Sequence, residues 1–231
     1  MTLGASVTPR AIVTDIEGTT SGLAFVHEVL FPYSRARLAA FVAAHPDEAA
    51  PVLDAVRAQA GAPTMDDEAC VVLLAQWHDA DLKIGPLKTL QGLIWADGYA
   101  SGDLKGHVYP DAAAGLRRWR ARGVELYVYS SGSAAAQKLL FGYSDQGDLS
   151  GLFRGHFDTA IGGKQDVAAY RAIAKALGLP AADILFLSDV QAELAAAQEA
   201  GFAVILLARE GSPPPCPFPV ASSFDAILPV T

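Results

Sequence analysis

The sequence predicts an α/β protein: a doubly wound parallel sheet into which an all-helical cap domain is inserted. From Val124 onward, short apolar runs alternate with segments of helical period, which is the pattern of a parallel sheet covered by helices. The run AIVTD at residues 11–15 has the apolar character of a further buried strand. Between that run and the helix predicted at residues 111–123, the sequence follows the helical period throughout.

We therefore predict two domains. Residues 1–20 and 110–231 form the α/β core, and residues 21–109 form the helical cap. A helical module inserted after the first strand would sit over the carboxyl ends of the strands, where open α/β sheets bind ligands. We expect the cap to act as a lid.

The individual elements follow from the same periodicities. In the core, strands are predicted at residues 124–129, 182–189 and 202–208, and helices at residues 133–143, 166–178 and 191–201. In the cap, helices are predicted at residues 34–45, 51–61 and 64–78. Thr64 is the predicted N-cap of the last of these, with Asp67 three residues later. Gly61 and the His45-Pro46 step are the predicted stops.

Composition excludes several classes of protein. Of the 231 residues, 52% are hydrophobic and 18% charged, so the chain is folded and globular. The 25 acidic and 17 basic residues give a formal net charge of -8, which repels nucleic acid and anionic membranes. Cys70 and Cys216 lie far apart without CxxC spacing, so no disulfide framework or zinc site is indicated.

Localisation and assembly follow from missing signals. The first ten residues lack a basic region followed by an apolar stretch, and no later apolar run is long enough to span a membrane. We predict a cytoplasmic protein with no membrane partner. No long heptad pattern is present, so we expect a monomer.

Carboxylates cluster where two of the predicted strands end. Asp15 and Glu17 follow the first strand, and Asp189 ends another, with Glu193 one helical turn later. Asp15 can act as a nucleophile, and Glu17, two residues on, can donate and accept protons. Asp189 beside Asp15 would be unfavourable unless one were protonated or a cation lay between them. Mg²⁺ is the cation best suited to such hard oxygen ligands, and it commonly bridges to phosphate.

Two further features suit a phosphate group. Ser130 and Ser131 follow the strand at residues 124–129 and open a predicted helix, so hydroxyls and backbone amides can bind phosphate there. Lys164, just before another helix, supplies a positive charge. Each feature alone has a plain structural explanation: a solvated turn, an N-cap or a surface lysine. Together they follow the ends of strands, which favours a ligand site.

These motifs resemble a known family. DIEGTT, SSGS, Lys164 and SDVQAE are similar to the four motifs of the haloacid dehalogenase superfamily of phosphohydrolases. Glu17 in place of the usual Asp, and the block LQGLIWADGY, resemble more closely its enolase-phosphatase family, the acireductone synthases of methionine salvage. The resemblance runs from about Ala11 to Gly201. It implies a haloacid dehalogenase-like fold.

The resemblance also implies roles for particular residues. Asp15 is expected to be the nucleophile and a Mg²⁺ ligand, Glu17 a ligand through its backbone carbonyl and the acid/base, and Asp189 the third protein ligand. The expected substrate-binding residues are Ser130, Ser131 and Lys164. The family's substrate is 2,3-diketo-5-methylthiopentyl-1-phosphate, which is enolised and dephosphorylated to the acireductone 1,2-dihydroxy-3-keto-5-methylthiopentene.

Some alternatives stay open at this stage. Which residue abstracts the proton does not follow from the sequence, and Glu17 is the hypothesis. His27, Trp95 and Tyr99 are candidates to face the substrate, although aromatic residues at helical spacing more often belong to a core. A generic magnesium-dependent small-molecule phosphatase, a phosphonate hydrolase, and a non-catalytic α/β binding domain are the competing functions. A small-molecule phosphate is the expected partner.

Overall fold

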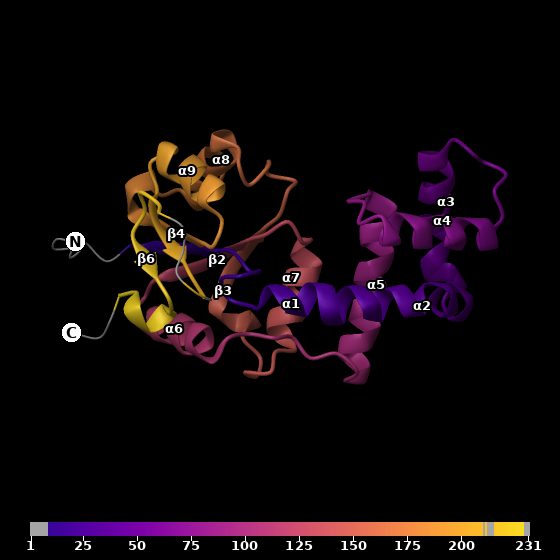
Figure 1. Cartoon of the computed structure of the whole chain (residues 1–231), viewed down its shortest axis with the longest axis horizontal. Helices are drawn as coiled ribbons and strands as arrows, with labels where there is room; N and C mark the ends of the chain where they lie inside the picture. The colour runs from indigo at the N-terminus through magenta and orange to yellow at the C-terminus, as the bar shows by residue number, and fades with distance from the viewer. Residues whose placement is uncertain (1–8, 210, 212–214, 229–231) are drawn as a thin grey trace. The chain divides into compact units, whose positions relative to one another are not determined.

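The computed structural model in Figure 1 describes residues 9–209, 211 and 215–228. The chain divides into two compact units. The core unit consists of the described residues of Met1–Leu23 and Gly106–Thr231, and the cap unit is Ala24–Lys105. The first eight residues, on which the prediction about export depends, lie outside the described part of the chain.

The core unit is built on a parallel sheet. Its strands are β1 (Ala11–Thr14), β2 (Glu125–Tyr129), β3 (Phe153–Phe157), β4 (Ile184–Ser188), β5 (Ala203–Leu207) and β6 (Val220–Ala221). They are ordered β3-β2-β1-β4-β5-β6, and each neighbouring pair is parallel. The strand order reverses at the pair β1 and β4, which is where doubly wound sheets bind ligands. This topology confirms the predicted fold class.

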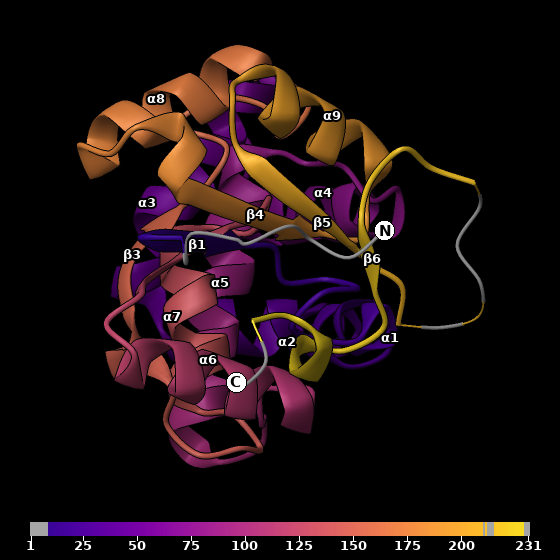
Figure 2. The same cartoon turned by 90° about the vertical axis from the view of Figure 1, so that its left-hand side faces the viewer.

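Helices cover both faces of this sheet. They are α6 (Pro110–Ala121), α7 (Ala134–Gly142), α8 (Val167–Leu177) and α9 (Gln191–Glu199), with short 3₁₀ turns at Ser150–Leu152, Ala181–Asp183 and Phe224–Ala226. Figure 2 shows α8 and α9 on one face and α6 and α7 on the other. On the first face, Tyr170, Phe186 and Phe202 pack edge to face in a buried cluster. On the second, Trp119 of α6 stacks on Phe224 at 5.0 Å between ring centroids.

The sequence reasoning missed β3 and β6. The segment FRGHF of β3 is only partly buried, because it lies at the end of the sheet and pairs on one side. It therefore lacks the apolar run by which buried strands are recognised. β6 has two residues, too few for any periodic signal.

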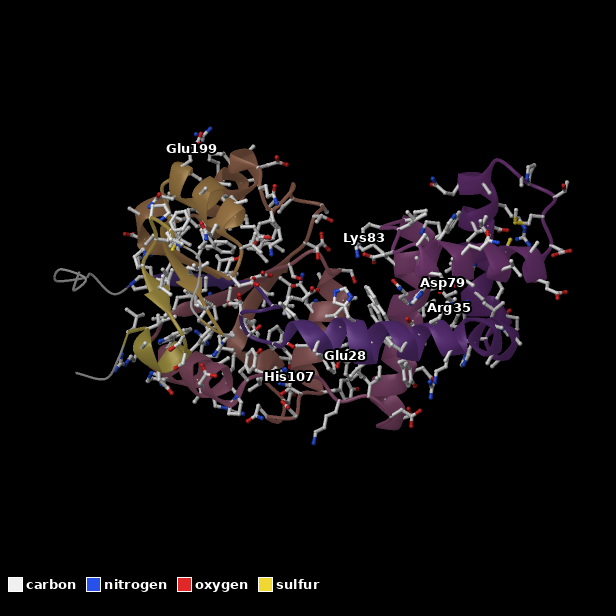
Figure 3. All side chains as sticks on the ribbon, in the orientation of Figure 1. Glu28, Arg35, Asp79, Lys83, His107 and Glu199 are labelled. Carbon is white, nitrogen blue, oxygen red and sulfur yellow. The ribbon has the colours of Figure 1, made fainter. Side chains whose placement is uncertain are left out.

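The cap unit is helical. It contains α2 (Phe31–Ala44), α3 (Pro46–Ala60), α4 (Asp67–Asp79) and α5 (Gly85–Ser101), preceded by α1 (Leu23–Phe25) and a π-helical turn at Val26–Leu30. Apolar side chains from the four longer helices form one buried cluster, including Leu38, Val52, Leu74 and Leu90. At its surface, Arg35 of α2 makes a two-pronged ion pair with Asp79 of α4 (Figure 3).

Two details of the cap helices differ from the prediction. The N-cap of α4 is Asp66, whose carboxylate accepts a hydrogen bond from the Ala69 amide, so the assignment to Thr64 was wrong. Helix α3 begins at Pro46 and not at Pro51. Proline is favoured in the first turn of a helix, and the sequence offers two such positions close together. The predicted stop at Gly61 is confirmed by its left-handed φ of 65°.

No helix in the described part of the chain is both long enough and apolar enough to cross a membrane.

Candidate active site

Asp15 is held rigidly where β1 leaves the sheet. Its amide donates to the carbonyl of Leu187 in the neighbouring strand β4 at 2.9 Å. Its own carbonyl accepts hydrogen bonds from the hydroxyls of Thr14 and Thr20. The carboxylate oxygen Oδ1 accepts from the Ile16 amide at 2.7 Å, and the residue is 4% exposed. The side chain therefore presents one defined orientation in an almost dry environment.

Lys164 lies between two buried carboxylates. Its Nζ is 2.7 Å from Asp15 Oδ1 and 2.8 Å from Glu193 Oε2. Burial lowers the pKa of Lys164, but the charges of Asp15 and Glu193 outweigh burial, and the net shift is upward. The lysine is therefore a permanent cation in this site.

Other contacts fix this lysine and its second carboxylate. The Ser188 hydroxyl donates to the same Oε2 of Glu193 at 2.9 Å, and the Tyr170 hydroxyl donates to the backbone carbonyl of Lys164 at 2.6 Å. Burial, followed by the charge of Asp15, raises the pKa of Glu193, and Lys164 opposes that rise. The Lys164 ammonium and the Glu193 carboxylate thus stabilise each other, because burying either charge without the other would cost free energy.

Asp189 follows β4 and lies against the turn after Asp15. Gly18 in that turn has a φ of +69°, and a Cβ atom there would overlap the Asp189 carboxylate. Burial first, and then the charge of Asp15, raise the pKa of Asp189 to about 6. Its Oδ1 is buried and has no hydrogen-bond partner within the described chain. A buried acceptor of this kind is expected to bind a cation or a hydrogen-bond donor.

The donor set suits a hard divalent cation. Asp15 and Asp189 bring carboxylates to the same turn, and Asp189 Oδ1 has no hydrogen-bond partner among the residues that the structure describes. Across the described residues, no group of three or more His, Cys, Asp or Glu side chains has metal-binding spacing. The carboxylates of Asp15 and Asp189 are oxygen ligands of the kind that suits Mg²⁺, which is commonly bound by one or two carboxylates and keeps several waters.

Ser130 and Ser131 lie in the loop after β2. Ser130 is buried; its amide donates to the Phe157 carbonyl, and its hydroxyl accepts from the Gly132 amide at 3.3 Å. Ser131 is exposed. Helix α7 begins only at Ala134 with Ser133 as its N-cap, so the two predicted serines lie before the helix and do not open it.

This loop ends at the same edge of the sheet as Asp15. Strand β1 pairs in register with β2 on one side and with β4 on the other, through Thr14 opposite Val128 and Leu187. The loop residues after β2, the Asp15 turn and Asp189 therefore follow three adjacent parallel strands. Glu17 lies partly buried in the middle of these, and its charge also raises the pKa of Asp189. The predicted residues thus share one edge of the sheet.

Comparison with known proteins identifies the family. The model for haloacid dehalogenase-like hydrolases matches residues 9–201. The protein of Methylococcus capsulatus named Enolase-phosphatase E1 is 55% identical, covering 95% of this chain and 98% of its own length. A protein of the same name from Pseudomonas aeruginosa is 56% identical over 89% of this chain and 92% of its own. This chain belongs to the enolase-phosphatase family.

Solved structures agree with that membership. The UTR4 protein of Saccharomyces cerevisiae has a TM-score of 0.83 and 32% identity, covering 95% of this chain and all of that one. The L-2-haloacid dehalogenase RSc1362 has a TM-score of 0.57 and 22% identity, so it shares the fold alone. The enolase-phosphatase chain is therefore a haloacid dehalogenase-like hydrolase in fold as well as in sequence.

The sequence of this enolase-phosphatase indicated no role for Glu193 and did not predict the hydrogen bonds of Arg209. The helical spacing of Glu193 from Asp189 was visible in the sequence, but its contact with Lys164 was not. Arg209 donates twice to the carbonyl of Thr19, at 2.9 and 2.6 Å, and once to Asp111 at 2.6 Å. No local pattern announces the contact with Thr19, because it joins residues 190 positions apart.

Proposed function

We propose that the protein enolises and dephosphorylates 2,3-diketo-5-methylthiopentyl-1-phosphate, releasing phosphate and the acireductone 1,2-dihydroxy-3-keto-5-methylthiopentene. The observation that carries the proposal is the buried Asp15 carboxylate, paired with Lys164, whose charge acts on Asp189, a carboxylate with one oxygen unpartnered among the described residues. The curated relatives quoted above carry the name Enolase-phosphatase E1, which supports this pair of reactions.

Asp15 is the proposed nucleophile. Its Oδ1 is engaged by the Ile16 amide and by Lys164, which leaves Oδ2 to attack phosphorus. The attack forms a phosphoryl-aspartate as the bond from phosphorus to the substrate oxygen breaks. Water then attacks that phosphorus, and Asp15 is released with inorganic phosphate. Glu17 is the proposed proton donor to the leaving oxygen and acceptor from the water.

Lys164 and the loop after β2 are proposed to bind the phosphate. The lysine ammonium neutralises charge on the phosphoryl oxygens, and Glu193 keeps it in place when the charge on Asp15 changes during reaction. Ser130 and Ser131 contribute hydroxyls and amides. Asp15, the two serines, Lys164 and Asp189 follow the four neighbouring strands β1, β2, β3 and β4, which allows the substrate to contact all of these groups together.

Magnesium is the proposed cofactor, held by the carboxylates of Asp15 and Asp189 and by the backbone carbonyl of Glu17. When bound, it supplies positive charge that offsets phosphate charge and stabilises an enolate. The fit rests on the buried Asp189 oxygen, which has no hydrogen-bond partner within the described part of the chain. Cytoplasmic location and a monomeric state stay predictions, which cell fractionation and gel filtration test.

The two steps are separable by experiment. Phosphate release and ultraviolet absorbance are followed together on the diketo phosphate or its desthio analogue, with and without magnesium. The proposal expects enol absorbance and phosphate only with the ion, and neither in Asp189→Asn. Phosphate release from common esters with no enol signal would favour a plain phosphatase.

The role of Glu17 needs its own variant. If Glu17 is the base for enolisation, Glu17→Gln loses the enol signal. Full enolisation by that variant would exclude Glu17 as the base.

A further inference from the structure

A pocket lies on the core unit, between α7, the segment that follows it and strand β3. It has a volume of about 720 Å³, within the usual range for sites that hold small molecules. In Figure 2, α7 and β3 occupy the same end of the sheet. None of the residues proposed above for catalysis, metal or phosphate binding lines this pocket.

The pocket carries positive charge on a protein of negative net charge. Among the described residues, its lining includes Lys138, Arg154 and one carboxylate, Asp148. Within the described chain, Lys138 takes part in no ion pair, and Arg154 makes one partly exposed ion pair of 3.3 Å with Glu125.

The carboxylate of Asp148 is hydrogen-bonded within its own turn. Oδ1 of Asp148 accepts hydrogen bonds from both the amide and the hydroxyl of Ser150, at 2.8 and 2.6 Å. These hydrogen bonds lower the pKa of Asp148, so it stays ionised at neutral pH and is held within its own turn. The lining side chains thus carry one more positive than negative charge. Arg154 is paired with Glu125, which lies outside the lining, so Lys138 is the cation without an ion-pair partner in the described chain.

His156 forms part of the pocket wall, and its protonation can be assigned from its neighbours. The side-chain nitrogen of Gln137 donates to the carbonyls of Gly132 and Phe157, both at 2.8 Å. The amide orientation is thereby set, and its oxygen lies 3.2 Å from His156 Nδ1. Because that oxygen can only accept, Nδ1 carries a hydrogen. Nε2 is then the nitrogen left for a ligand, and it repels an anion unless it too is protonated.

We propose that this pocket binds a small organic anion, a carboxylate or a phosphate monoester, among Lys138, Arg154 and His156. The rings of Tyr143 and Phe153, which also line it, take the apolar part of the ligand. Burial and the charge of Lys138 lower the pKa of His156. An anion beside Nε2 reverses that effect, so binding and protonation of His156 favour each other.

The test uses the full chain, isotopically labelled and free of magnesium, with succinate and inorganic phosphate as probes. The ring resonances of His156, assigned with His156→Gln, are followed by NMR across a pH series. We expect saturable shifts and a rise in the His156 pKa of about one pH unit. Lys138→Ala and Arg154→Ala should each weaken binding by about tenfold, at constant thermal stability. Lys175→Ala, an exposed lysine on α8, is the matched control.

The possible outcomes separate the two ligand chemistries. A response to both probes supports recognition of anionic charge, and a response to phosphate alone supports a phosphate monoester. No saturable shift with either probe, or a shift that persists in both alanine variants, overturns the proposal. The readout requires no catalysis, so it stands or falls separately from the proposed reaction.

Discussion

Asparagine at position 189 should make the magnesium-free protein more stable while abolishing its activity. The carboxylate of Asp189 has one buried oxygen with no partner in the described chain, and it lies near the charge of Asp15. Asparagine preserves the shape and removes the charge. The free-energy cost of burying the charged Asp189 without a cation can thus be measured as the higher stability of Asp189→Asn.

The size of the gain follows from the pKa. Burial and the charge of Asp15 raise it from 3.8 to about 6. A difference of about two pH units corresponds to about 3 kcal/mol when the carboxylate is ionised in both states. Asp189 is partly exposed, so solvent screening reduces this to about 1–2 kcal/mol. For a chain of this size, the midpoint of thermal unfolding should rise by about 2 to 8 °C.

The pH dependence gives the sharper check. A carboxylate whose folded pKa lies above its unfolded value stabilises the fold below the unfolded pKa, and that contribution is lost as pH rises through the folded pKa. The advantage of Asp189→Asn should therefore be largest above about pH 7, fall to about half by about pH 5, and nearly vanish by about pH 4.

The assay is calorimetry in a chelator across that pH range, with activity measured separately in magnesium. Glu199→Gln is the control, since Glu199 is an exposed carboxylate on α9 (Figure 3), and its variant should show neither effect. A variant Asp189→Asn that melts lower than the parent at neutral pH without magnesium would refute the reasoning.

Three further changes test the remaining contacts. Lys164→Met leaves two buried carboxylates without their cation, so the free energy of unfolding in urea should fall by about 3–5 kcal/mol and phosphate release should nearly cease. Unchanged stability would contradict the ion-pair geometry. Gly18→Ala should cost about 1–3 kcal/mol and weaken magnesium binding in calorimetric titration. Gly61→Ala has a similar positive φ in open space, and an equal loss there would mean that the overlap is unimportant. Arg209→Lys cannot keep every hydrogen bond and should cost about 1–3 kcal/mol in urea, whereas exposed Arg171→Lys should cost nothing measurable.

The fold class could be predicted because its signals are local. Fully buried strands such as β4, ILFLS, are continuous apolar runs, and the helices between them keep a regular period. Where a strand lies at the end of the sheet, as β3 does, its composition is mixed and the signal disappears. The N-cap residue of a helix is harder still to predict, because Thr64 and Asp66 are both acceptable N-cap residues and the backbone conformation determines which of them caps α4.

The candidate site could be predicted only as a list of positions. Parallel strands bring their carboxyl ends to one edge, so the loops after β1, β2 and β4 were expected together, and the register of these strands supports that. The resemblance to enolase-phosphatases added roles for those positions. Neither the strand pattern nor the resemblance predicted that Lys164 contacts Glu193 as well as Asp15. Neither predicted that one oxygen of Asp189 has no hydrogen-bond partner in the described chain.

By itself, the sequence determined the alternation of buried strands and helices, apart from β3 and β6, and the residue types at the strand ends, since periodicity and turn chemistry act over a few neighbouring residues. Tertiary structure alone decided which charges meet. Lys164 bridges Asp15 and Glu193, and Arg209 reaches Thr19 across 190 positions, because strand register and crossovers bring distant segments to one edge. The strength of those charges was also decided there, since a pKa depends on burial and neighbours that a linear sequence does not contain.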